Sequence, residues 1–276
     1  MGQPDAVFNK ANLQADYFIN KKRGVKQMKI IVCKTYQEMS QAAADIVARQ
    51  IKKKPDTVLG LATGSTPVGL YQNLIKMNRD GVIDFSGVVT FNLDEYVGLP
   101  KEHPCSYYRF MFDNLFDHIN IKKENVHLPD GLAPSLEDEC KVYEQKITQA
   151  GGIDLQVLGI GHNGHIGFNE PGTPFESVSH IVDLAPRTIQ ANSRFFSSPD
   201  EVPRKALSMG IKSIMHARMI LFLASGKDKA EIVSRAFNGP VTTDVPASVL
   251  QLHPDVTAIL DEDAASCLQK QLLLNI

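Results

Sequence analysis

The sequence has few of the features that mark secreted proteins. Its four cysteines, Cys33, Cys105, Cys140 and Cys267, are widely spaced and include no C-x-x-C pair. Scattered cysteines of this kind favour free thiols over a disulfide framework. The N-terminus lacks the basic flank, apolar stretch and small-residue cleavage site of a secretory signal, so we expect a cytoplasmic protein.

Long apolar runs and a strong net charge are also missing. The longest apolar runs, such as 219–224, are strand-length and fall far short of the roughly 20 residues that a membrane-spanning helix needs. The formal net charge is −2 and no cluster of Lys and Arg falls on a nucleic-acid-binding motif, so we expect neither a membrane nor a nucleic-acid partner. With 276 residues, 43% of them hydrophobic, the chain can bury a sizeable core as one domain.

Residues 1–27 are polar and show no sustained period, whereas Met28 opens the first clear strand. We therefore expect one domain over 28–276, preceded by an extension at 1–27 that is a tag or an upstream start and is disordered. A helical arm is the alternative for this extension.

Apolar runs alternate with segments of helical periodicity along the rest of the chain. Expected strands cover 29–33, 57–62, 88–92, 153–158, 218–224 and 256–260. Expected helices cover 36–53, a segment from about 68, 106–119, 202–209 and 246–250. Repeated strand–loop–helix units predict an α/β fold, Rossmann-like, with a doubly wound and mostly parallel sheet and helices on both faces.

The loop 159–171, GIGHNGHIGFNEP, concentrates glycines, two histidines and a carboxylate directly after an apolar strand. Open α/β sheets bind ligands at the carboxyl ends of their strands, so we interpret it as an active-site loop. We expect His165 to be an acid/base whose ring is oriented by Glu170 and Asn163, because histidine titrates near neutrality and needs a second group to fix its tautomer.

The same loop admits three other interpretations. Its glycines satisfy the dinucleotide-binding pattern G-x-G-x-x-G, but Gly167 and Pro171 occupy positions where that motif needs a helix. His162, His165 and Glu170 could bind a metal, although the glycines remove the helix that would align both rings. The third interpretation is a plain glycine-rich turn whose histidines only hydrogen-bond to backbone. It accounts for the glycines but not for a His and a Glu five residues apart.

A second loop, Thr63-Gly64-Ser65-Thr66-Pro67, joins a strand to a helix start. Backbone N–H groups and the positive end of the helix dipole bind phosphate in such a loop. It lacks the Lys of nucleotide-binding loops, which favours a sugar phosphate, and a plain helix cap is the alternative. Asp94 and Glu95 end another strand, and alternation along an extended segment sends them to opposite sides, so one can enter the cleft while the other pairs elsewhere.

Four strings together resemble glucosamine-6-phosphate deaminases: LATGSTPVGLY (61–71), FNLDEYVGLPKEHPCSYYRF (91–110), GIGHNGHIGFNEPG (159–172) and ANSRFF (191–196). The similarity runs over nearly the whole chain from Met28 onward. It implies conversion of glucosamine 6-phosphate and water to fructose 6-phosphate and ammonia, without a metal or any other cofactor. A lactonase acting on phosphorylated gluconate and a non-catalytic sugar-phosphate sensor are the rival functions.

The resemblance also implies roles for individual residues. Asp94 moves a proton between C2 and C1 of the opened sugar, and His165 assists ring opening. Many members carry Asp where this chain has Asn163, which can orient a ring but adds no charge. The substrate phosphate is expected at Thr63, Gly64, Ser65 and Thr66, and on Arg194 and Lys229.

The region 171–203 is rich in Ser, Thr, Pro and Asn and is expected to form a mobile lid over the cleft. Members activated by N-acetylglucosamine 6-phosphate carry basic residues shortly after Asn-Glu-Pro, where this chain has His180, Val182 and Asp183. We therefore expect no activation by that ligand, and a monomer or small homo-oligomer.

Overall fold

The computed structural model describes residues 14–18, 28–185, 189, 190, 193, 196, 198 and 201–274. Its centre is an eight-stranded sheet with the order β1-β2-β11-β10-β7-β3-β4-β6, in which every pair is parallel except β1 with β2. The strands are β1 (Gln14–Phe18), β2 (Lys29–Cys33), β3 (Val58–Leu61), β4 (Val89–Asn92), β6 (Val126–His127), β7 (Leu155–Leu158), β10 (Met219–Ala224) and β11 (Val256–Asp261).

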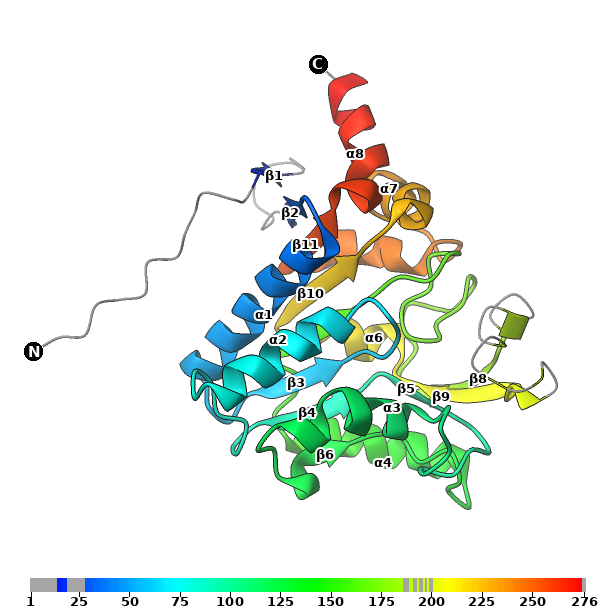
Figure 1. The fold of residues 1–276 in the computed structure, drawn as a ribbon. Coiled ribbons are helices and arrows are strands. Elements are labelled where there is room, and N and C mark those ends of the chain that lie inside the picture. Colours follow the sequence, from blue (N-terminus) through cyan, green and yellow to red (C-terminus); the bar gives the residue numbers. More distant parts are fainter. Residues whose placement is uncertain are drawn as a thin grey trace, which may run out of the picture.

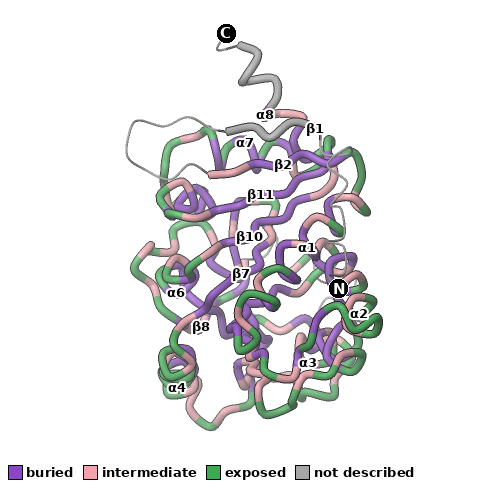
Figure 2. Tube along the Cα trace, turned by 90° about the vertical axis from the view of Figure 1, so that its left-hand side faces the viewer, coloured by how far each residue is buried: buried purple, intermediate pink, exposed green. Residues whose placement is uncertain are grey.

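Helices cover both faces of this sheet, as expected. One hydrophobic cluster joins the sheet to α1 (Tyr36–Lys53), α2 (Val68–Arg79) and α3 (Tyr107–Asn114). A second cluster, on the other face, joins it to α4 (Leu136–Gln149), α6 (Ile211–Met215), α7 (Ala230–Asn238) and α8 (Glu262–Leu274). Figure 1 shows α1 and α2 in front of the strands, and in Figure 2 the buried strands run between α1, α2 and α3 on one side and α4 and α6 on the other. The predicted doubly wound, mostly parallel sheet is confirmed.

The first helix shows how local sequence sets these elements. α1 begins after Thr35, whose hydroxyl accepts a hydrogen bond from the Glu38 N–H, while the Glu38 carboxylate accepts one from the Lys34 N–H. The Thr35 hydroxyl thus satisfies one N–H group of the first turn that has no partner inside the helix, and the Glu38 carboxylate fixes the residue that precedes the cap. α1 ends at Lys53, two residues before Pro55, which cannot continue a helix. The predicted bounds of 36–53 are confirmed.

A small antiparallel sheet stands beside the large one, with the order β5-β9-β8. It contains β5 (Asp94–Tyr96), β8 (His180–Asp183) and β9 (Lys205–Ser208). The prediction of a helix over 202–209 is wrong. Val202, Ala206 and Met209 are spaced as on a helix face, but so short a pattern does not separate helix from strand, and pairing of β9 with both β5 and β8 decides for the strand.

Smaller differences concern element ends. The helix expected over 106–119 stops at Asn114, and a 3-10 turn, η2 (Phe116–His118), follows. Other 3-10 segments are η3 (Lys123–Asn125), η6 (Lys227–Lys229) and η7 (Pro246–Leu252), of which η7 stands where a helix over 246–250 was expected. Within the extension 1–27, residues 14–18 form β1, which was not expected; its other residues lie outside the described part of the chain. No helix in the described part of the chain is long and apolar enough to span a bilayer.

Candidate active site

Four loops meet at one edge of the large sheet. They follow β3, β4, β7 and β10, which are parallel strands with the spatial order β10-β7-β3-β4. Because the carboxyl ends of parallel strands share an edge, the loops that carry Thr63, Asp94, His165 and Lys229 are brought to the same side of the sheet. The prediction that the glycine loop leaves the carboxyl end of a central strand is confirmed, since β7 has β10 on one side and β3 on the other.

Asp94 lies where the chain passes from β4 of the large sheet to β5 of the small one. Its side chain is buried, with 7% of the residue's surface exposed. Burial, and secondly the charge of Glu95, raise the pKa of the Asp94 carboxyl to about 8. A carboxyl with such a pKa holds a proton far more strongly than an exposed aspartate does, which suits a group that must both take and return one.

The loop of His165 passes directly beside this carboxyl. Gly167 has a φ of 58°, in the left-handed region, and a Cβ placed on it would lie 3.7 Å from Oδ2 of Asp94 and 3.1 Å from the hydroxyl oxygen of Ser208. The structure thus brings the backbone two residues after His165 against Asp94, although the two residues are far apart in sequence.

The imidazole of His165 packs on the backbone of Gly161. The Gly161 N–H donates a hydrogen bond of 2.9 Å to the His165 carbonyl, which closes the loop on itself. A Cβ at position 161 would lie only 2.1–2.4 Å from three atoms of the ring. This position therefore requires glycine, because any side chain would displace the imidazole.

Glu170 lies beside the same ring, and Asn163 is hydrogen-bonded to Glu170. Nδ1 of His165 is 3.6 Å from Oε2 of Glu170, and Asn163 donates a hydrogen bond of 2.6 Å from its Nδ2 to that same oxygen. The His165 N–H donates to Oδ1 of Asn163 at 3.2 Å. His165 and Glu170 keep 21% and 13% of their side-chain surface exposed, so the group is held inside the protein but can be reached from solvent. The three residues expected to act together are brought together.

Two of the rival interpretations of the loop, dinucleotide binding and metal binding, find no support in this geometry. After Gly164 the chain forms turns and a short bridge between Ile166 and Asn169, so the helix of a dinucleotide-binding motif does not follow. Among the described residues no group of three or more His, Cys, Asp or Glu side chains could hold a metal ion.

The loop Thr63–Thr66 presents its backbone to solvent. Gly64 and Ser65 are exposed, and Gly64 has a φ of 96° that favours glycine. Tyr36, the first residue of α1, supports this loop. Its hydroxyl lies 3.1 Å from the carbonyl oxygens of Ser65 and Thr66. The same hydroxyl accepts a hydrogen bond of 2.8 Å from the Gly69 N–H. The loop is thereby fixed with its N–H groups at the start of α2.

Lys229 ends the short η6 turn that follows β10. Its side chain is 16% exposed, and its ammonium lies 4.0 Å from the Asp228 carboxylate, which is in turn 3.6 Å from Nδ1 of His162. The preceding turn is anchored by Asp261, which accepts hydrogen bonds from the Gly226 N–H at 3.0 and 3.1 Å. Lys229 is thus presented beside the glycine loop. Arg194 lies outside the described residues.

Sequence reasoning missed several residues that hold the site in shape. Tyr36 was not singled out. The Ser208 hydroxyl accepts a hydrogen bond of 3.0 Å from the Phe168 N–H, and the buried Asn169 side chain donates to the carbonyls of Ile166 and Met209. These contacts join β9 to the glycine loop, and no local pattern in the sequence reveals them because they depend on the position of a strand that was predicted as a helix.

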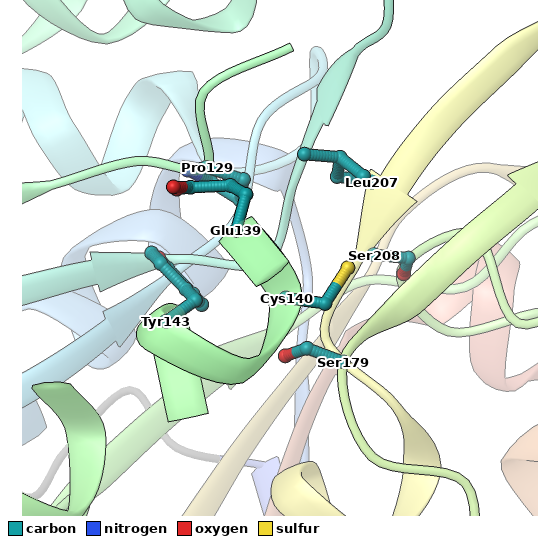
Figure 3. Close-up of a pocket in the computed structure, with 7 residues that line it drawn as sticks. All are labelled: Pro129, Glu139, Cys140, Tyr143, Ser179, Leu207 and Ser208. Atoms are coloured by element: carbon teal, nitrogen blue, oxygen red, sulfur yellow. The ribbon is translucent and has the colours of Figure 1, made fainter. Parts of the chain in front are cut away.

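Neither of two hollows in the described surface coincides with this site. Figure 3 shows one between α4 and β9, too tight to admit a water molecule. Its lining residues are Pro129, Glu139, Cys140, Tyr143, Ser179, Leu207 and Ser208. The other, of about 230 Å³, lies beside Lys29 and Met219, at the amino ends of the strands. The convergence of loops at the carboxyl ends is therefore the better guide to the site.

Comparison with known proteins agrees with this placement. A family model described as glucosamine-6-phosphate isomerases/6-phosphogluconolactonase matches residues 34–259. The chain belongs to this family. Its relatives include the glucosamine-6-phosphate deaminase of Thermoanaerobacter pseudethanolicus, 60% identical over 249 residues that cover 90% of this chain and 98% of that protein.

Solved structures of the glucosamine-6-phosphate isomerase/6-phosphogluconolactonase family share the fold. One, described as a monomeric glucosamine-6-phosphate deaminase, is 51% identical, with a TM-score of 0.85, and the match covers 87% of this chain and all of that one. A 6-phosphogluconolactonase from Trypanosoma cruzi is 21% identical, with a TM-score of 0.70 over 88% of this chain and 97% of the other. At that identity the similarity concerns the fold alone.

Proposed function

We propose that this protein is a glucosamine-6-phosphate deaminase, which converts glucosamine 6-phosphate and water to fructose 6-phosphate and ammonia. The observation that carries the proposal is the meeting of two acid/base groups at one sheet edge: the buried Asp94 carboxyl, and His165 with Glu170 and Asn163. The deaminases among its relatives support the same activity.

In this reaction His165 carries the ring-oxygen proton while the sugar opens. Glu170, 3.6 Å from Nδ1, and Asn163, which donates to Glu170, orient the imidazole for that transfer. Asp94, ionised, then removes the proton from C2, leaving an enolamine, and returns a proton to C1. The resulting imine at C2 adds water, and the carbinolamine loses ammonia to give the ketone of fructose 6-phosphate.

The substrate phosphate would bind across two loops and the lid. The N–H groups of Thr63, Gly64, Ser65 and Thr66, at the start of α2, suit an anion because the helix dipole is positive there. Lys229 adds a cation from the η6 turn. Arg194 would add a second one from the lid over 171–203, since a planar guanidinium binds phosphate oxygens in pairs.

The activity test is direct. Purified protein should release equal amounts of ammonia and fructose 6-phosphate from glucosamine 6-phosphate, each followed by a coupled assay. A phosphorylated gluconolactone serves as the competing substrate, because a lactonase would open that ester and leave the amino sugar untouched. Lactone hydrolysis without ammonia release would refute the proposal, and binding of the amino sugar without turnover would favour a sensor.

We also propose that the protein acts as a monomer or small homo-oligomer in the cytoplasm, on a small amino-sugar phosphate, without nucleic acid, membrane or cofactor. The solved deaminase that covers 87% of this chain is described as monomeric, which supports the first part.

A further inference from the structure

The side chain of Glu95, next to Asp94, is enclosed at the start of α3. Only 4% of its surface is exposed. Its Oε1 accepts hydrogen bonds from the N–H groups of Tyr96 at 2.8 Å and Tyr107 at 2.9 Å, and its Oε2 accepts one from the Tyr108 N–H at 2.8 Å. Tyr107 and Tyr108 are the first two residues of α3, whose N–H groups find no partner inside a helix. The carboxylate therefore clamps this helix end to β5.

This clamp determines the direction of Asp94. β5 is only three residues long and lies at the edge of the small sheet, where β9 is its one strand neighbour in the described part of the chain. Successive side chains of an extended segment point to opposite sides, so fixing Glu95 against α3 sends Asp94 the other way. Strand pairing alone, through the three residue pairs that β5 forms with β9, offers a weaker constraint at an edge.

The clamp also holds a negative charge beside Asp94. Burial raises the pKa of Glu95, but its three N–H donors act in the opposite direction, and the positive end of the α3 dipole also favours the carboxylate. Other titratable groups around the pair include Tyr96 of β5, Tyr107 of α3, Tyr143 of α4 and Asp130. Burial raises the pKa of Tyr107 and Tyr143 well above the usual range, so these two stay neutral.

We propose that Glu95 is a positioning residue for the reaction. Its hydrogen bonds to the N-terminus of α3 hold Asp94 in the orientation in which its carboxylate faces the carbon from which the sugar proton is taken. The inference rests on the proposed deaminase function and on Asp94 as its proton carrier. Two consequences follow. Loss of the Glu95 charge should let Asp94 ionise at lower pH, and loss of its hydrogen bonds should misplace Asp94.

The test compares three variants by kcat, KM and the pH dependence of kcat/KM. Glu95→Gln removes the charge and replaces one accepting oxygen by an amide that cannot accept from the Tyr108 N–H. We expect kcat to fall roughly tenfold or more, because small misplacements of a reacting group are costly, with KM within about threefold. The acid limb of kcat/KM should move to lower pH by about half a unit or more.

Two matched variants separate this role from general support of α3. Ser106→Ala removes the other cap of the same helix, a hydroxyl that accepts from the Arg109 N–H at 3.0 Å, and should lower the melting temperature while leaving the acid limb in place. Glu95→Asp keeps the charge on a side chain that is one carbon shorter. It should return the acid limb to its wild-type pH, while kcat remains below that of the wild type.

An unchanged acid limb in Glu95→Gln, or a kcat within about twofold of wild type, would overturn the inference. If Glu95→Gln does not fold, Glu95→Asp decides: a shifted acid limb or a full kcat counts against the clamp. Failure of the underlying function is distinguishable, because the wild type itself would then release no ammonia from glucosamine 6-phosphate. Failure of Asp94 as proton carrier would appear as undiminished turnover in Asp94→Asn, whatever position 95 contains.

Discussion

The ionisation of a single residue, the buried Asp94, makes the stability of the protein depend on pH. Burial first, and the Glu95 charge second, raise the pKa of this carboxyl from 3.8 to about 8. A group whose pKa is higher in the folded state stabilises the fold below its unfolded pKa, and this contribution is lost as pH rises through the folded value. The wild type should therefore lose stability between about pH 4 and pH 8 because Asp94 must ionise inside the protein.

Asp94→Asn should escape this loss, since an amide does not ionise. The melting temperature of Asp94→Asn minus that of wild type should be at least about 3 °C higher at pH 9 than at pH 5. Each kcal/mol of stability shifts the melting temperature of a chain of this size by about 2–4 °C. Asp228→Asn, at a mostly exposed position, is the control. A pH-independent difference between Asp94→Asn and wild type would show that Asp94 titrates as an ordinary aspartate.

Lys229 is expected to act on affinity and not on chemistry. Removing a charge-assisted contact to the phosphate costs about 1.5–3 kcal/mol, so Lys229→Ala should raise KM by roughly one to two decades with a much smaller effect on kcat. Lys227→Ala, at an exposed position of the same turn, should leave KM within about twofold. Arg194→Ala should resemble Lys229→Ala. Wild-type KM values in both Lys229→Ala and Arg194→Ala would place the phosphate elsewhere.

At the scale of elements, the glycine loop is the part whose shape is most constrained. A methyl group at Gly161 would lie 2.1–2.4 Å from atoms of the His165 ring, whereas one at Gly159 would meet nothing within 4 Å. Gly161→Ala should therefore move the imidazole and lower kcat by roughly a hundredfold with little change in KM.

Gly159→Ala is the matched control for that loop and should keep kcat within about twofold of wild type. Steady-state kinetics on both variants, with circular dichroism to confirm folding, is the measurement. Equal kcat values for the two would mean that the packing of His165 on Gly161 has no catalytic importance.

The elements that local sequence determines were predictable, and those that depend on distant partners were not. α1 was placed correctly because its apolar residues recur at helical spacing and Pro55 closes it. Six strands of the large sheet were recognised as apolar runs before loops, but β1 and the two-residue β6 were not expected. β9 was mistaken for a helix, since Val202, Ala206 and Met209 have helical spacing and only pairing with β5 and β8 makes the segment a strand.

The candidate site shows the same division. The motif residues were found from sequence because their residue types carry chemistry at strand ends, while their individual roles remain predictions. The contacts of Tyr36 with the phosphate loop and of Ser208 with the Phe168 N–H could not be found, because each joins segments at least 29 residues apart.

At the scale of the whole molecule, the segment that would hold an activator is built into the small sheet. His180, Val182 and Asp183 belong to β8; Val182 is buried, and Asp183 lies 3.7 Å from the ammonium of Lys205. A carboxylate and a buried valine cannot replace the cations that clamp an activator phosphate in the allosteric members.

We therefore predict hyperbolic kinetics with no response to N-acetylglucosamine 6-phosphate, and a monomer or small oligomer by light scattering. Rate curves measured over a range of substrate concentrations, with and without the acetylated sugar, check the first part. Sigmoidal curves that become hyperbolic on its addition would refute the prediction without affecting the active-site assignments.

The central claim is that Asp94 carries the sugar proton, and NMR of the reaction in D₂O tests it most directly. The wild type should form fructose 6-phosphate whose C1 keeps at least part of the proton removed from C2, because the buried Asp94 moves it between the two carbons. Asp94→Asn should show neither product nor exchange of the C2 proton above about one part in 10² of the wild-type rate, while substrate affinity stays within a few-fold. Turnover by Asp94→Asn at more than about a tenth of the wild-type rate would contradict the account.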